Sequence, residues 1–117
     1  MRIWDTIPCK DLCNSHLLGE HNEVHAIWNT FRDKHTRFYN NPEMKRWNGK
    51  FKALYNRHEE QVEEMKRRNF NHKSPLEPVS FTTGKAIQDE FLFTKQQHID
   101  TLRERSLDKN KRCNCKL

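Results

Sequence analysis

The sequence predicts an all-α fold, with one compact domain of three main helices and a long irregular connection before the last helix. Apolar residues recur every three or four positions in three segments, and the alternating pattern of a β-strand is absent. The chain has 117 residues, of which 33% are hydrophobic. This length and composition suit one thin core, so we expect residues 1–117 to form a single domain.

The first predicted helix runs from about Cys9 or Lys10 to about Lys34. Pro8 stands immediately before it, which is a common place for a helix to begin. The helical spacing produces one apolar stripe, made of Leu17, Val24, Trp28 and Phe31.

The second predicted helix has the clearest pattern and is expected to end near Asn69. Arg67 and Arg68 lie in its last turn, where cations suit the helix dipole. Its stripe steps by three or four through Trp47, Phe51, Leu54, Tyr55, His58, Val62 and Met65. Because Trp47 and Phe51 fall on this stripe, we interpret them as core residues, with base stacking as the alternative.

An irregular connection is predicted over residues 70–93, which contain Pro75, Pro78 and Gly84. Thr94 and Gln97 then form the pattern of a capping box, and a third helix follows through Ile99 and Leu102. The last residues, about 107–117, are expected to form a loose basic tail.

The charge balance favours an anionic partner, because the formal net charge is +6. Nucleic acid is the first candidate. Lys45, Arg46, Lys50 and Lys52 could hold backbone phosphates. A solvated, mildly basic surface explains the same charge equally well, so charge alone does not decide.

No apolar run approaches the roughly 20 residues that span a bilayer, and the opening residues MRIWDTIPCK lack the apolar stretch of a signal peptide. We therefore expect a cytoplasmic protein that does not enter a membrane.

The four cysteines are expected to be thiols or metal ligands rather than disulfides in that compartment. Cys9 and Cys13 form a C-x3-C pattern, and Cys113 and Cys115 form C-x-C almost a hundred residues later. Four thiolates could bind zinc if the tail folded back. These spacings support zinc only weakly, so we expect no metal and no other cofactor.

Three polar residues of the first predicted helix share one face. His16, Glu20 and Glu23 are spaced by four and three, which places them in a narrow sector beside the apolar stripe. Two carboxylates and an imidazole at the edge of a core are candidates for acid–base chemistry. An ordinary polar helix margin is the alternative interpretation.

Two segments and the opening of the chain carry a resemblance. The stretch from Leu12 to Val24 reads LCNSHLLGEHNEV, the stretch from Lys50 to Asn71 reads KFKALYNRHEEQVEEMKRRNFN, and Arg2-Ile3 opens the chain. Together these residues resemble the pyrimidine-dimer DNA glycosylases of the phage endonuclease V family, over less than half of the chain.

The resemblance implies an enzyme of DNA repair that is both a glycosylase and an AP lyase. In that family the N-terminal α-amine attacks C1′ of a damaged nucleotide, the base leaves, an imine forms, and β-elimination cuts the strand. Here Arg2 favours retention of the initiator, so the nucleophile would be the amine of Met1. The carboxylate that matches Glu23 would stabilise the sugar cation and move protons. An α-amine suits this role, since its reference pKa of about 7.7–8.0 leaves a neutral fraction at pH 7.

The expected partner is double-stranded DNA with a damaged base, most simply a UV pyrimidine dimer, or an abasic site, bound by a monomer. Asn22 and Ala26 stand where the family has two DNA-gripping arginines. The expected DNA-binding residues are Arg2, His16, Glu20, Asn22, Lys45 and Arg46. Two alternatives remain, a non-catalytic DNA-binding module of the same fold and a zinc-stapled nucleic-acid or protein adaptor.

Overall fold

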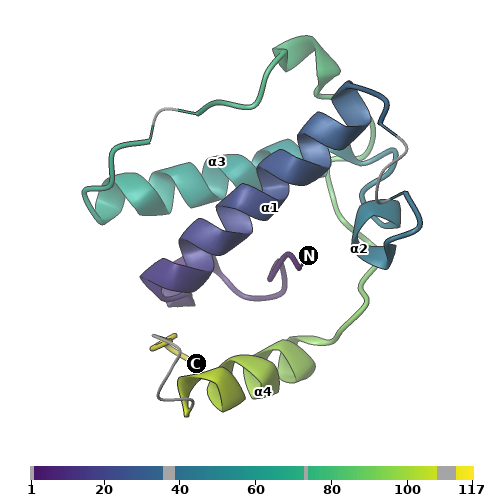
Figure 1. The fold of residues 1–117 in the computed structure, drawn as a ribbon. Helices are drawn as coiled ribbons and strands as arrows, with labels where there is room; N and C mark the ends of the chain where they lie inside the picture. The colour runs from purple at the N-terminus through teal and green to yellow at the C-terminus, as the bar shows by residue number, and fades with distance from the viewer. Residues whose placement is uncertain (1, 36–38, 73, 108–112) are drawn as a thin grey trace.

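The computed structural model describes residues 2–35, 39–72, 74–107 and 113–117. Its helices are α1 (Asn14–Arg32), α2 (Pro42–Lys45), α3 (Phe51–Arg67) and α4 (Lys95–Ser106), with 3-10 turns at Cys9–Asp11 and Val79–Phe81 (Figure 1). The described residues contain no β-strand and only an isolated bridge between Lys50 and Gly84. The predicted all-α class with three main helices is confirmed, and α2 adds a single turn.

The first long helix starts later than its pattern suggested. Cys9–Asp11 form a separate 3-10 turn, and Leu12 has an extended backbone with φ −79° and ψ 138°. This break prevents a continuous helix, so α1 begins at Asn14 and ends at Arg32. The predicted start near Cys9 is therefore wrong.

The second long helix also starts later than its apolar stripe. Gly49 has φ +75°, in the left-handed region that glycine tolerates, and this turn separates Trp47 from α3. Asn69 has φ +63° just beyond the end of α3, which agrees with the predicted end there.

The core lies where α1 crosses α3. Trp28 of α1, Leu54 of α3 and Trp47 from the turn after α2 are all buried in one cluster, and Phe51 packs against it. Burying one side chain such as Leu54 contributes about 1.5–3 kcal/mol. The interpretation of Trp47 and Phe51 as core residues is confirmed.

The N-terminal segment, residues 2–8, runs between α1 and α4 rather than along the outside (Figure 1). Ile3, Trp4 and Ile7 are buried. Trp4 contacts the ring of His16 on α1, with centroids 5.6 Å apart, and the ring of His98 on α4 at 5.1 Å. This segment therefore joins α4 to the rest of the molecule.

The connection between α3 and α4 is irregular, as predicted, and lies against the body. The indole of Trp28 donates to the carbonyl oxygen of Glu77 at 2.9 Å, and Phe81 stacks on Phe51 with centroids 4.5 Å apart. The capping box is present before α4, where Thr94 and Gln97 each accept from the other's backbone N–H.

The end of the chain differs from the loose tail that was expected. Cys113 is buried, and the backbone N–H of Lys116 donates to the carbonyl oxygen of Asp11 at 2.7 Å. Residues 113–117 are therefore docked near the start of α1, while residues 108–112 lie outside the described part. No helix within the described ranges is both long and apolar enough to cross a membrane.

Candidate active site

A pocket of about 290 Å³ opens between the N-terminal segment, α1 and α4. Four of the residues predicted from the sequence line it, and they are Arg2, His16, Glu20 and Glu23. The remaining lining residues are Trp4, Ser15, Gly19 and Arg105. Helical spacing along α1 and the path of the N-terminal segment together create this site. Met1, the predicted nucleophile, lies outside the described residues.

Glu23 is half-buried in this pocket. Within the described part of the chain its carboxylate has no hydrogen-bond or ion-pair partner. A carboxylate without such partners can interact with a bound cation or exchange a proton with a bound group.

Two guanidinium groups face the same pocket. Arg2 lies over the ring of Trp4 at 5.0 Å and over the ring of Phe93 at 4.3 Å, and Arg105 lies over Trp4 at 5.2 Å. Burial and the positive charge of Arg105 lower the pKa of Arg2. Two guanidiniums held this close favour binding of an anion such as a phosphate.

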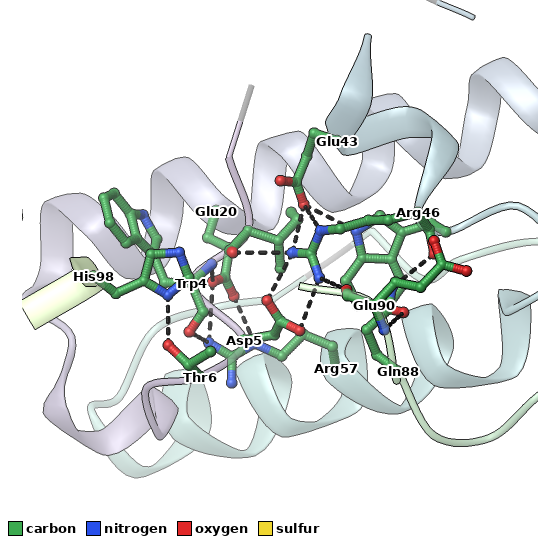
Figure 2. Close-up of polar contacts among 12 residues, drawn as sticks. Trp4, Asp5, Thr6, Glu20, Glu43, Arg46, Arg57, Gln88, Glu90 and His98 are labelled. Atoms are coloured by element: carbon green, nitrogen blue, oxygen red, sulfur yellow. Dashed lines mark hydrogen bonds and ion pairs between the residues drawn. The ribbon is translucent and has the colours of Figure 1, made fainter. Parts of the chain in front are cut away.

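Glu20 faces the interior rather than solvent. It is 2% exposed and accepts hydrogen bonds from Arg57 at 2.9 and 3.0 Å, and from Gln61. It also accepts from the backbone N–H of Trp4 at 2.5 Å, while Arg57 donates to the carbonyl oxygen of Trp4 at 2.9 Å (Figure 2). This carboxylate therefore positions the N-terminal segment, and its contact with DNA stays a prediction.

Arg46 is also internal, at 4% exposed. Its guanidinium is paired with Asp5 at 2.7 Å and with Glu43 at 2.6 Å, and it donates to the carbonyl oxygen of Ile3 at 3.3 Å (Figure 2). The predicted contact between Arg46 and a DNA phosphate stays a prediction, and it would require these internal ion pairs to open. Arg46 and Arg57 instead hold consecutive residues of the N-terminal segment.

The other predicted contacts lie away from the pocket. Asn22 and Lys45 are exposed and do not line it. Lys50 is buried and paired with Asp89 at 2.8 Å and Glu90 at 2.9 Å. The basic cluster at 45–52 is thus partly internal.

Four charged or polar residues that position the N-terminal segment were not identified from the sequence, although three of them carried a local signal. Arg57 and Gln61 fall among the apolar positions of that helix, between Leu54 and Met65, where a polar side chain must be buried. Glu43 precedes its partner Arg46 by three residues, a spacing that allows an ion pair on one helical turn. For Asp5 no local pattern revealed the pairing, because Arg46 lies 41 residues away.

A larger hollow of about 670 Å³ lies between Pro8–Lys10 and α3. Its rim has three glutamates and three cationic side chains, so it does not favour an anion, and no predicted site residue lines it.

A comparison with protein families supports the resemblance seen in the sequence. The model of the family described as pyrimidine dimer DNA glycosylase matches residues 1–78 of the 117 residues. No curated protein and no solved structure matches the chain significantly. The matched residues include the N-terminal segment, Glu23 and both internal arginines. With a match over two thirds of its length, the chain belongs to the pyrimidine dimer DNA glycosylase family.

Proposed function

We propose that this chain is a DNA glycosylase and AP lyase that attacks C1′ of a damaged nucleotide through the α-amine of Met1, with Glu23 as the partner carboxylate. The observation that carries the proposal is the shared pocket: Arg2, covalently next to that amine, and Glu23 line the same cavity. Consecutive Cα atoms are about 3.8 Å apart, so the amine belongs to the immediate neighbourhood of a pocket residue.

The chemistry requires no redox partner. The amine nitrogen forms a bond to C1′, the glycosidic bond breaks, and the base leaves with the bonding electrons and a proton. Opening of the sugar ring produces the imine. Removal of a proton from C2′ then expels the phosphate from C3′, and water hydrolyses the imine to release the enzyme. Glu23 would stabilise the cationic sugar and transfer these protons.

The buried arginines support this assignment because they fix the N-terminal segment at Ile3, Trp4 and Asp5. Arg57 and Glu20 bind both backbone polar groups of Trp4, and Arg46 binds Ile3 and Asp5. A nucleophile at the start of a chain would otherwise lose conformational entropy whenever it attacked. Fixing the segment beforehand removes that cost.

The substrate we propose is duplex DNA containing a pyrimidine dimer or an abasic site. An enzyme that acts on a base must extrude the nucleotide from the stack, and the extruded unit brings its phosphates into the site. Arg2 and Arg105 line the pocket, so in this proposal they bind those phosphates. The exposed Lys45 remains a proposed contact farther along the backbone.

Borohydride trapping on a duplex with one abasic site tests the nucleophile. Borohydride reduces an imine to a stable covalent adduct, so the unmodified protein should be trapped. Protein with a fully acetylated N-terminus should give no adduct and should still bind DNA, because its arginines are unchanged. An adduct formed by the acetylated protein would identify an internal lysine as the nucleophile and reject the assignment of Met1.

Glu23→Gln tests the carboxylate separately. Loss of a general acid–base group typically costs about 10²–10⁴-fold, so release of a damaged base should fall by that factor. Trapping on an abasic site should fall less, because that site has already lost its base. Glu63→Gln is the matched control, since it makes the same change at an exposed position on α3. Equal base release by Glu23→Gln and the control would reject Glu23 as the partner carboxylate, whereas no base release and no adduct from the unmodified protein would favour a non-catalytic DNA-binding module.

A further inference from the structure

The start of α1 and the docked C-terminal segment bring together a compact group of metal-ligand side chains. Cys13, His16, Cys113 and Cys115 each offer one atom, and these atoms all lie within 4.8 Å of one another. Two of the four residues are buried and two are half-buried. Cys9, which the sequence suggested as a fourth thiol, is replaced in this group by His16.

Two of three distances within the group match the edges of a tetrahedral zinc site, and the third is about 0.5 Å shorter. Zinc binds sulfur at about 2.3 Å and histidine nitrogen at about 2.0–2.1 Å, so a tetrahedron separates two sulfurs by about 3.8 Å and sulfur from nitrogen by about 3.6 Å. The Sγ atoms of Cys113 and Cys115 are 3.7 Å apart. His16 Nδ1 lies 3.7 Å from the Sγ of Cys115 and 3.1 Å from the Sγ of Cys13.

The surroundings also suit thiolate ligands. The backbone N–H of Cys13 points at the Sγ of Cys115, 3.1 Å away, and this type of hydrogen bond stabilises a metal-bound thiolate. Residues 113–117 pack on the body with few apolar side chains, because Cys113 alone is buried among them. A metal would supply the binding energy that such a short, polar segment lacks.

We propose that Cys13, His16, Cys113 and Cys115 bind one zinc ion that holds the C-terminal segment on the start of α1. The site is complete, with four protein ligands, so its role is structural rather than catalytic. It is independent of the proposed enzymatic reaction. It nevertheless borders the pocket, because His16 contributes to both.

Zinc bound to Nδ1 of His16 would also change the hydrogen bond between Arg105 and Nε2 of the same ring. Arg105 lies 3.1 Å from His16 Nε2, which acts there as an acceptor. A metal on Nδ1 leaves the ring proton on Nε2, so Arg105 would give up this bond and direct its guanidinium elsewhere in the pocket that it lines.

Cobalt substitution of the full chain tests this site. Cobalt bound to thiolates in a tetrahedral site gives a strong charge-transfer absorption that histidine and carboxylate ligands do not give. The wild type should show this band, with an intensity that corresponds to one thiolate-bound cobalt per chain, and zinc should abolish it. Cys113→Ser and Cys115→Ser should each abolish the band. Cys9→Ser is the matched control, because Cys9 is a buried cysteine outside the group, and it should retain the band.

Absence of the thiolate band in the reduced wild type would overturn the proposal. So would a disulfide between Cys113 and Cys115 in protein purified under reducing conditions, detected by mass spectrometry. Retention of the band in Cys115→Ser would also reject this ligand set.

A second group of ligands, carried by different observations, lies between α1 and α3. His21, His25, His58 and His72 place one ring nitrogen each within 4.8 Å of all the others. The Nε2 atoms of His21 and His25 are 3.2 Å apart, close to the edge of about 3.4 Å expected for two nitrogens on one zinc ion. Among the described residues the buried Nε2 of His72 has no hydrogen-bond partner.

In two of these four histidines, the Nδ1 atom lies beside a side-chain oxygen that can accept its hydrogen bond. His21 Nδ1 is 3.1 Å from Oε1 of Gln61, and His58 Nδ1 is 3.0 Å from Oε1 of Glu59. Donation to these oxygens leaves the lone pair of each Nε2 directed inward, which is the arrangement that metal-binding histidines adopt. His58 Nε2 lies 3.3 Å from the carbonyl oxygen of Ser74, a contact that a metal would replace.

We infer that these four imidazoles bind a second divalent transition-metal ion, for which zinc is the probe. Four neutral nitrogen ligands suit zinc, nickel or copper rather than magnesium or calcium. Wild type should bind about two zinc ions per chain, and His72→Gln about one, with the thiolate–cobalt band intact as a marker of folding. His35→Gln, at an exposed position outside the group, should bind two. A stoichiometry in His72→Gln equal to that of His35→Gln would reject this site.

Discussion

Arg57 of α3 donates two hydrogen bonds to the carboxylate oxygens of Glu20 on α1, and this pair holds the backbone of Trp4 from both sides. The side chain of Glu20 is fully buried and that of Arg57 is 6% exposed. A buried pair with this many hydrogen bonds positions the N-terminal segment, and through it one wall of the pocket.

Glu20→Gln should therefore destabilise the protein by about 3–5 kcal/mol, because it leaves the Arg57 guanidinium buried without its counter-charge. Urea unfolding measures this difference. Glu23→Gln makes the same change one turn away on α1, at a half-buried carboxylate without a described partner, and should cost less than about 0.5 kcal/mol. Similar losses for the two variants would contradict the positioning role of Glu20.

Lys45, at the end of α2, and Arg46, which follows it, should affect the free energy of unfolding differently when each is replaced by alanine. Arg46→Ala removes the cationic partner of Asp5 and Glu43, whose side chains stay largely buried, so we expect a loss of about 3–5 kcal/mol in the free energy of unfolding. Lys45→Ala, at an exposed position, should change it by less than about 0.5 kcal/mol. If Lys45→Ala is the more destabilising variant in thermal unfolding, the internal role of Arg46 is wrong.

Arg105→Ala should weaken DNA binding in a salt-dependent way. Each phosphate contact contributes about 0.9 to the slope of log affinity against log salt, so the slope should fall by about that amount. Fluorescence anisotropy on a duplex with an abasic site measures it at several salt concentrations. Lys66→Ala removes an exposed cation from the far end of α3 and should leave the slope unchanged. Equal slopes for both variants would place the phosphate contacts elsewhere.

Stability should decrease as the pH falls below about 6.5, in part through His98. Burial, opposed by Asp5 and assisted by the charges of Arg2, Arg46 and Arg57, lowers the pKa of His98 to about 4. Between pH 6.5 and 4 the unfolded chain binds a proton there that the folded chain does not. The stabilisation is complete above pH 6.5 and is lost on acidification, on the order of 3 kcal/mol by pH 4.

His98→Gln should reduce this pH dependence by about one proton, as measured by urea unfolding at a series of pH values. The comparison uses slopes, because the substitution also removes the contact between His98 and Thr6. The exposed His35→Gln is the control and should keep the wild-type slope. An unchanged slope in His98→Gln would show that other groups carry the effect.

Local patterns were sufficient for the helices. The stripe from Leu54 to Met65 predicted α3, and the pair Thr94 and Gln97 predicted the start of α4, because helical periodicity and capping depend on residues three or four apart. Predicted starts were less accurate. The helices begin at Asn14 and Phe51, where backbone conformation rather than side-chain polarity sets the boundary.

Sequence also placed Arg2 and Glu23 in one site, through a resemblance that the family match supports. The sequence did not show which charged side chains are exposed and which are buried in ion pairs. Glu20 and Arg46 were expected to contact DNA, and the structure buries both with partners 37 and 41 residues away, Arg57 and Asp5.

The sequence by itself therefore determined the helical class, the main core positions and the candidate carboxylate, since each follows from short spacings or a family pattern. Only the tertiary structure decided which charged groups are internal and which ligands meet. Cys13 and Cys115 lie 102 residues apart, and His21 and Gln61 lie 40 apart, yet both pairs are in contact. The desolvation and coordination of a side chain depend on all the groups around it, and chain folding brings those groups from positions that no local spacing relates.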